Sequence, residues 1–190
     1  SKVMLQLDTV QFLLQHHTHE HLPFLGLESS NHARHRTTLH ATLARLVFSV
    51  PEQMAARFDA FVEPTLDVLA TLGAMRELRA SGPGGDERAL RLAIVGVLRD
   101  LRGVTQATHN RRTFGLLFDA LHPAHCAVLA RIADAWHDVP EVTTSLLRFV
   151  HELVYNKGQR VVFEQSSPNG ILLFREASRV IVAYGTRALA

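Results

Sequence analysis

Apolar residues recur at helical spacing along nearly the whole chain. In one series, separations of three and four residues place the apolar side chains on a single helical face: Leu90, Ile94, Val97, Leu98 and Leu101. The polar residues between them fall on the opposite face. Comparable series predict further helices within Val3–Leu14, Leu39–Val50, Met54–Leu72, Phe114–Leu121, Leu129–Trp136, Val142–Leu153 and Ile171–Tyr184.

Proline and glycine mark where these helices are interrupted. The segment "RASGPGGDER" (Arg79–Arg88) combines several glycines with a proline and predicts the clearest break in the chain, near residues 80–86. Pro64 lies inside an apolar series, and because it lacks a backbone N–H, it is expected to kink or split that helix. Pro123 and Pro140 predict further helix boundaries, since a residue before proline disfavours helical geometry.

These helices predict an all-α fold. The only strand-like segment, "RVVFE" (Arg160–Glu164), is short and has no partner strand elsewhere in the sequence. A helix pair about every forty residues, joined by short connectors, is typical of HEAT-type repeats. We therefore expect residues 1–190 to form a single α-solenoid unit of about four antiparallel helix pairs. A compact helical bundle is the alternative that periodicity leaves open.

Composition limits the classes of partner. The 190 residues include 47% hydrophobic residues and carry a formal net charge of only +2, without the dense basic clusters typical of proteins that bind nucleic acid or membranes. We therefore expect neither as a partner. The single cysteine, Cys126, cannot form an internal disulfide and favours a reducing compartment. Both ends of the sequence lie within helix-like patterns, which predicts a segment of a longer protein.

A histidine cluster is the strongest candidate for metal binding. The segment "HHTHEH" (His16–His21) places His17 and His21 four residues apart, on one face if the segment is helical. The order of histidine and glutamate found in zinc metalloproteases is absent, and spacing fixes no third ligand. His17 and His21 are therefore weak candidates, and a hydrophilic helix end is the alternative.

Arginines form the main candidate for partner contact. Arg88, Arg91, Arg99 and Arg102 fall on the side of their predicted helix opposite the apolar series, where they could meet an acidic partner surface. The alternative is a solvated outer face, partly offset by the nearby acids Asp86, Glu87 and Asp100. The loop from Asn156 to Arg160 supplies two further candidates, Lys157 and Arg160.

The segment "SSPNGILLFRE" (Ser166–Glu176) predicts a helix start. Ser166 or Ser167 can cap the helix, Pro168 suits its first turn, and Gly170 permits close approach to a neighbouring segment. Such a start can bind an anion, but the only adjoining cations are Lys157 and Arg160. A corner between packed helices is the preferred interpretation.

No catalytic motif occurs in the sequence, and no cofactor is expected. Glycine-flanked nucleophilic serines, phosphate-binding glycine-lysine loops and telling carboxylate pairs are all absent. His125 and Cys126 are adjacent, so on a helix they diverge by about 100° and do not form a nucleophile–base pair. Packing is the better explanation for this cysteine.

Several motifs together resemble a known family. Near the end of the chain are "ELVYNKGQR" (Glu152–Arg160), the segment from Ser166 to Glu176, and "YGTR" (Tyr184–Arg187). Earlier segments, in the family's order and spacing, are "TVQFLL", "HTHEHLPFLG", "RTTL", "LARL" and "GVLRDLRG". The chain thus resembles the exportin-seven branch of the importin-β superfamily, also known as the Ran-binding protein sixteen/seventeen group. The similarity covers nearly the whole chain and is weakest at residues 28–34 and 75–86. His16 and His19 depart from the family's pattern, which weakens the metal hypothesis.

This resemblance implies a central to C-terminal segment of a HEAT-repeat nuclear transport receptor. Such a receptor binds GTP-loaded Ran together with protein cargo, contacts phenylalanine-glycine nucleoporins, and shuttles between nucleus and cytoplasm. The resemblance implies no enzymatic activity, because Ran carries the GTPase site. The family's Ran-contacting repeats lie largely toward its N-terminus, outside this segment.

Two other functions stay open on the residues alone. One is a helical-repeat scaffold or adaptor of another pathway, and the other is a metal-dependent hydrolase built on the histidine cluster. A solenoid segment is also expected to expose apolar faces at both of its ends, which predicts self-association through these ends.

Overall fold

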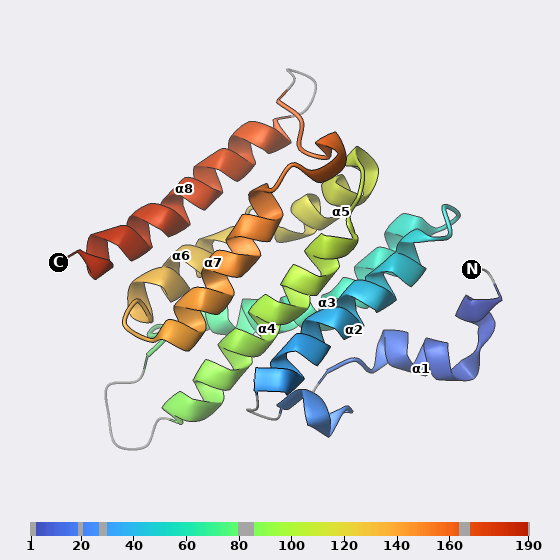
Figure 1. The fold of residues 1–190 in the computed structure, drawn as a ribbon, viewed down its shortest axis with the longest axis horizontal. Coiled ribbons are helices and arrows are strands. Elements are labelled where there is room, and N and C mark those ends of the chain that lie inside the picture. The colour runs from blue at the N-terminus through green and yellow to red at the C-terminus, as the bar shows by residue number, and fades with distance from the viewer. Residues whose placement is uncertain (1–2, 19–20, 27–29, 80–85, 164–167, 190) are drawn as a thin grey trace.

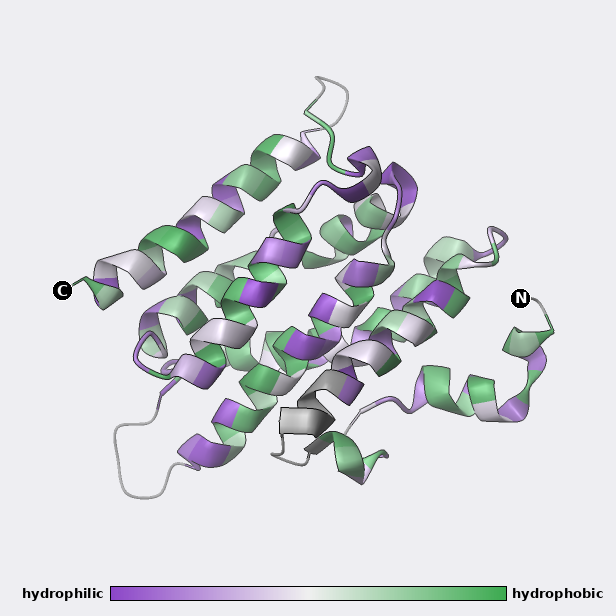
Figure 2. Ribbon diagram, in the orientation of Figure 1, coloured by the Kyte–Doolittle hydropathy of each residue, from purple (hydrophilic) through white to green (hydrophobic). Residues whose placement is uncertain are grey.

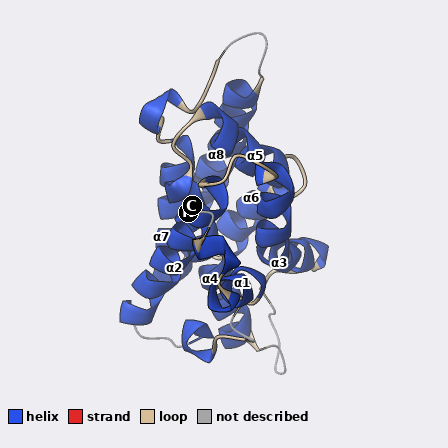
Figure 3. Cartoon of the chain, turned by 90° about the vertical axis from the view of Figure 1, so that its right-hand side faces the viewer, coloured by secondary structure: helices blue, strands red, loops and turns tan. Residues whose placement is uncertain are grey.

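The computed structural model describes residues 3–18, 21–26, 30–79, 86–163 and 168–189. Within these residues the chain is helical and contains no strand (Figures 1 and 3), which confirms the all-α prediction. The α-helices are α1 (Asp8–Gln15), α2 (Ser30–Phe48), α3 (Met54–Ala74), α4 (Glu87–Ala107), α5 (Arg111–Leu121), α6 (Cys126–Ala135), α7 (Pro140–Val154) and α8 (Asn169–Ala188). Three short 3₁₀ segments cover Met4–Gln6, Pro23–Gly26 and Lys157–Gln159.

The helices form two layers. Helices α2, α4 and α7 lie side by side in one layer, with α4 packed between the other two (Figure 1). Helices α3, α5 and α6 lie behind them, as the edge-on view shows (Figure 3), and α8 packs mainly on α6. From α2 onward the chain alternates between the layers, passing through α3, α4, α5 with α6, and α7 before it reaches α8, whereas α1 contacts α3. This arrangement fits the predicted helical-repeat solenoid.

The predicted apolar series form the core between the layers, and Figure 2 shows the corresponding alternation of apolar and polar residues along the helices. Ile94, Leu98 and Leu101 on α4 are completely buried. The series on α3, α5, α6 and α7 are buried as well. Trp136 is also fully buried, and its indole Nε1–H donates to the Leu78 carbonyl oxygen at 2.8 Å, so its one polar atom is satisfied.

Pro64 does not split its helix. Helix α3 runs without interruption from Met54 to Ala74, so that part of the prediction is wrong. Proline removes one N–H from the helix, whereas its neighbours Phe61, Val62 and Thr65 are all buried. Side-chain packing therefore holds the helix together across the missing hydrogen bond.

The N-terminal helix is shorter than predicted. Leu7 adopts an extended conformation (φ −72°, ψ 128°) between the first 3₁₀ segment and α1. Val3 and Leu7 are 73% and 49% exposed, while Leu5 is buried. The regular spacing of apolar residues was misleading here, because the backbone changes direction inside the series.

Two other predicted features include residues that the structure does not describe. The break expected near residues 80–86 falls almost entirely outside the described residues, although Asp86 caps α4 by accepting from the Ala89 N–H at 2.9 Å. Residues 160–163 form no strand, and Glu164 lies outside the described part. No single described helix is long and apolar enough to cross a bilayer; α5 and α6 meet that criterion only together, across a bend of 65°.

Candidate functional site

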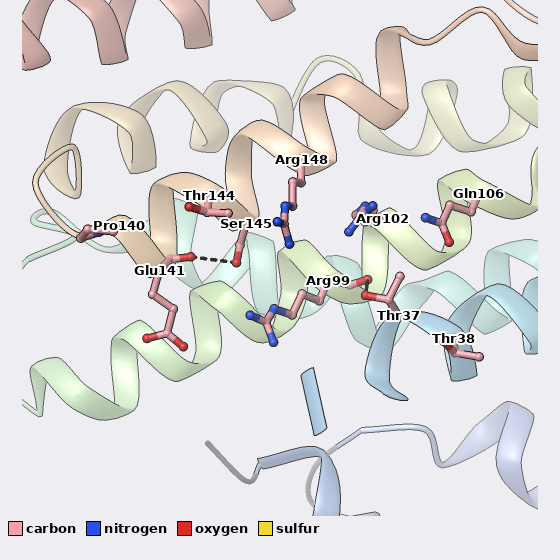
Figure 4. Close-up of a pocket in the computed structure, with 10 residues that line it drawn as sticks. All are labelled: Thr37, Thr38, Arg99, Arg102, Gln106, Pro140, Glu141, Thr144, Ser145 and Arg148. Carbon is pink, nitrogen blue, oxygen red and sulfur yellow. Dashed lines mark hydrogen bonds between the residues drawn. The ribbon is translucent and has the colours of Figure 1, made fainter. Parts of the chain in front are cut away.

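A polar groove opens on the layer formed by α2, α4 and α7. Its volume is 680 Å³. Figure 4 shows its lining: Thr37, Thr38, Arg99, Arg102, Gln106, Pro140, Glu141, Thr144, Ser145 and Arg148. Because α4 packs directly against both α2 and α7, the groove is a feature of the surface that these three helices share.

Three arginines dominate the charge of this groove. Arg99 and Arg102 extend from α4, and Arg148 reaches toward α4 from α7 (Figure 4). No carboxylate among the described residues forms an ion pair with any of the three. The Nε atom of Arg102 is buried and has no hydrogen-bond partner in the described part of the chain. Burial lowers the pKa of Arg99, and the positive charges of Arg148, Arg36 and Arg102 lower it further, against the opposing effect of Glu141.

The acids expected to offset the arginine series are used elsewhere. Asp86 caps α4, Glu87 pairs with Arg79 at 3.2 Å, and Asp100 faces α2 on the buried side of the layer. The four arginines of the predicted series have different surroundings along α4. Arg88 is exposed near the helix start, and Arg91 lies 3.5 Å from Glu141, so only Arg99 and Arg102 of that set reach the groove.

Arg148 was not predicted as a site residue. It lies 46 positions after Arg102 in the printed sequence, and nothing in the α7 series singles it out. Arg148 can be predicted only from the topology, because in a two-layer repeat the polar faces of α4 and α7 lie next to each other in the same layer.

Beneath this layer, a buried ion pair joins α2 to α4. Arg36 donates from Nε and Nη2 to the two oxygens of Asp100 at 2.5 and 2.6 Å, and from Nη1 to the Leu25 carbonyl oxygen at 3.0 Å. The Arg36 and Asp100 side chains are only 13% and 6% exposed. The helices approach closely at Gly103, where an added Cβ would lie 2.4 Å from the Thr37 carbonyl oxygen.

His17 belongs to a buried hydrogen-bonded chain. Its Nε2 lies 2.9 Å from the carbonyl oxygen of Phe61, which can only accept, so Nε2 carries a proton. Its Nδ1 lies 3.1 Å from His40 Nε2. The other nitrogen of His40, Nδ1, faces two acceptors, the Arg36 carbonyl oxygen at 3.0 Å and Asp100 Oδ1 at 3.1 Å. The hydrogen-bonded chain thus runs from the Phe61 carbonyl through both imidazole rings to Arg36 and Asp100.

This environment opposes a further proton on His17. Burial lowers its pKa to about 4, with the charge of His40 as the next contribution. Both ring nitrogens of His17 are therefore occupied by protein groups. His21 is exposed and contacts Thr18 Oγ1 at 3.2 Å, and α1 ends at Gln15, so the helical face expected to hold both candidates does not exist. Within the described residues, no group of three or more potential ligands could hold a metal ion.

Arg160 is a buried structural residue, which corrects its prediction as a partner contact. Only 1% of it is exposed. Its Nη1 donates at 2.8 Å to the carbonyl oxygens of Thr105 and Thr108 and at 2.7 Å to the Thr108 hydroxyl, and its Nη2 donates to the Glu152 carbonyl oxygen. These acceptors lie at the carboxyl ends of α4 and α7, where helix carbonyls lack partners. Lys157 is exposed and stays a candidate.

The start of α8 forms a packed corner. The N–H of Gly170 donates to the Val162 carbonyl oxygen at 3.0 Å, and an added Cβ at this glycine would lie 2.3 Å from that oxygen. The predicted close approach is thus present. Ser166 and Ser167 lie outside the described residues, and Pro168 makes no side-chain cap. Because Arg160 is buried elsewhere, it does not supply charge to an anion at this helix start.

Cys126 is buried, and burial raises the pKa of its thiol to about 12, so packing explains this residue. Helix α8 forms where the apolar series predicted a helix, and it carries an exposed apolar surface. Phe174 is 68% exposed, and Ile171, Ile181 and Val182 are also exposed, whereas the helix buries Leu173, Glu176 and Val180.

Comparisons with known proteins identify relatives of this segment. Exportin-7-B of Xenopus laevis is 38% identical over 189 residues, which cover 98% of this chain. Ran-binding protein 17 of Mus musculus is 36% identical over 99% of the chain, and Ran-binding protein 16 of Drosophila melanogaster 40% identical over 97%. The chain is homologous to one segment of the exportin-7 and Ran-binding protein 16/17 group. It spans about 17% of the length of these relatives.

The similarity to Exportin-7-B covers 98% of the chain and therefore includes at least part of every described α-helix. No family model matches the chain, and no solved structure matches it. Homology and helical architecture together confirm the family resemblance seen in the motifs.

Proposed function

We propose that this chain is a segment of a nuclear transport receptor that binds GTP-loaded Ran and protein cargo. The observation that carries the proposal is its collinear similarity, over nearly its whole length, to exportin-7 and Ran-binding proteins. The repeat architecture supports it, because receptors that bind proteins need a long, adaptable surface more than an enclosed pocket.

The architecture suggests how such a segment contributes to binding. Helix α4 packs against α2 on one side and α7 on the other, and α6 packs against α8. Small rotations at successive contacts add up along a repeat array. Ran and cargo are then coupled when both favour the same curvature of the array, and that coupling is reciprocal.

The residues proposed for partner contact are the exposed cations Arg88 and Lys157, the groove-lining cations Arg99 and Arg102, and the partly buried Arg91. We further propose that the whole receptor contacts phenylalanine-glycine nucleoporins and shuttles between nucleus and cytoplasm. We expect no enzymatic activity from the segment itself, in keeping with relatives named as exportins and Ran-binding proteins.

A nucleotide-dependent pull-down tests this function. Immobilised Ran, loaded with GDP or with a non-hydrolysable GTP analogue, is incubated with the intact receptor that contains this segment. We expect capture only by the GTP-like form, and weak or no capture of the 190-residue chain alone. Equal capture by both nucleotide states contradicts the proposal, and capture of other proteins without Ran supports a scaffold of another pathway.

A further inference from the structure

The groove between α2, α4 and α7 combines three cations with one anion. Arg99, Arg102 and Arg148 have no ion-pair partner in the described part of the chain, and Glu141 is the single acidic residue of the lining. Folding thus holds three guanidinium groups in one groove, where Glu141 alone among the lining residues offsets their charge. Such an arrangement costs free energy through mutual repulsion, which a bound anion would relieve.

We propose that this groove is a binding site for an acidic protein segment carrying at least two carboxylates. The site goes beyond the transport function proposed above.

The distribution of charge within the groove gives the ligand an orientation. Glu141 lies near the Pro140 end of the lining, whereas Gln106 lies toward the other end, with Arg102 and Arg148 between them (Figure 4). Carboxylates of a ligand would therefore bind near Arg102 and Arg148, away from Glu141. Planar guanidinium groups suit this role because each can form two parallel hydrogen bonds to one carboxylate.

Size and lining favour a peptide over other anions. A volume of 680 Å³ is far larger than a single inorganic ion requires, and it falls within the range of sites for ligands of several residues or rings. The remaining lining consists largely of hydroxyl and amide side chains, which can bind a peptide backbone. The lining contains no aromatic residue on which a nucleobase could stack, which disfavours single-stranded nucleic acid.

A direct binding measurement tests the site without Ran, so this proposal and the transport function can fail separately. Fluorescence anisotropy with the 190-residue chain uses a labelled oligoglutamate peptide, with oligolysine and oligothymidylate of equal length as comparisons and inorganic phosphate as competitor. We expect saturable binding of oligoglutamate that weakens as salt increases. Oligolysine is expected not to bind.

Charge reversal in the groove provides the specific test. Arg148→Glu removes one cation, and Thr144→Glu adds an anion at an exposed lining position without removing any arginine. Each change should weaken oligoglutamate binding by about tenfold, since one charge at close range contributes more than 1 kcal/mol. Arg112→Glu is the matched control: Arg112 is exposed on α5, in the other layer, and its reversal should leave affinity unchanged. Thermal melting checks that all three variants fold.

Four results overturn the proposal. They are absence of saturable oligoglutamate binding, an equal loss of affinity in Arg112→Glu, tighter binding of oligothymidylate, and displacement of the peptide by phosphate at the peptide's own concentration. Tighter binding of oligothymidylate would assign the groove to nucleic acid. Displacement of the peptide by phosphate would show an adventitious ion site only.

Discussion

Protonation of His17 should make the fold acid-sensitive. Its pKa is about 4 in the folded protein, against 6.5 for an ordinary histidine. Burial of the ring lowers the pKa most, and the charges of His40 and Arg36 lower it further. The Phe61 carbonyl and Asp100 act in the opposite direction. Between these two pKa values the unfolded chain binds a proton that the folded chain does not. The free energy of unfolding contributed by His17 is therefore fully present above pH 6.5 and declines as the pH falls toward 4.

The size of this effect follows from the two pKa values. Their separation corresponds to a loss of about 3 kcal/mol in the free energy of unfolding between pH 7 and pH 4. For a chain of this length, a loss of about 3 kcal/mol lowers the melting temperature by about 6–12 °C. The structural cost has a visible origin, because a proton on Nδ1 removes the acceptor for His40 Nε2.

The assay compares urea unfolding of the wild-type chain and His17→Gln from pH 7 to pH 4. Glutamine can still donate an N–H to the Phe61 carbonyl oxygen but does not titrate. We expect His17→Gln to be less stable at pH 7, with the difference shrinking by about 3 kcal/mol at pH 4. Carboxylates elsewhere titrate equally in both proteins and cancel. A difference that stays constant across this range refutes the reasoning.

Three further predictions concern packing. Gly170→Ala should destabilise the chain by about 1–3 kcal/mol, because the added Cβ would meet the Val162 carbonyl oxygen. Gly185→Ala, which places its Cβ in open space on the same helix, should instead stabilise the chain by about 0.5–1 kcal/mol. Urea unfolding measures both effects, and equal effects would contradict the contact at Gly170. Arg160→Met should lower the free energy of unfolding by about 3 kcal/mol or more, because buried carbonyl oxygens lose their donor. An unchanged unfolding midpoint would contradict a stabilising role for these hydrogen bonds. The chain should self-associate in sedimentation equilibrium and Phe174→Glu should weaken that association; a strictly monomeric wild-type chain at high concentration contradicts this.

The sequence predicted the helices well wherever one face is buried between the two layers. The series on α4, α5, α6 and α7 combine regular spacing with continuous burial, so periodicity and packing agree. The pattern also predicted α8 but gives no information on burial where an apolar series lacks a partner. On α8, Ile171, Phe174 and Ile181 repeat at helical spacing yet are exposed, and spacing alone cannot tell which of two apolar faces packs inward.

The candidate site was predictable only in part. Arg99 and Arg102 were found because they share one face of one helix, but Arg148 comes from a different repeat and required knowledge of the layer. Arg160 was wrongly predicted to contact a partner, because the sequence does not show that its side chain is buried. A charged residue in a polar loop is usually exposed, and its burial depends on unpaired helix carbonyls that the sequence does not display.

The close approach of α2 to α4 has an evolutionary consequence. Gly96 and Gly103, about two turns apart on α4, both face α2, where one would meet the Arg36 guanidinium and the other the backbone at Thr37. A foreign helix inserted in place of α4 would need glycine at the position of Gly103 and an acid at the position of Asp100 to pair with Arg36. Shuffling of repeats during the history of this array would therefore have to carry α2 and α4 together, as one inherited module.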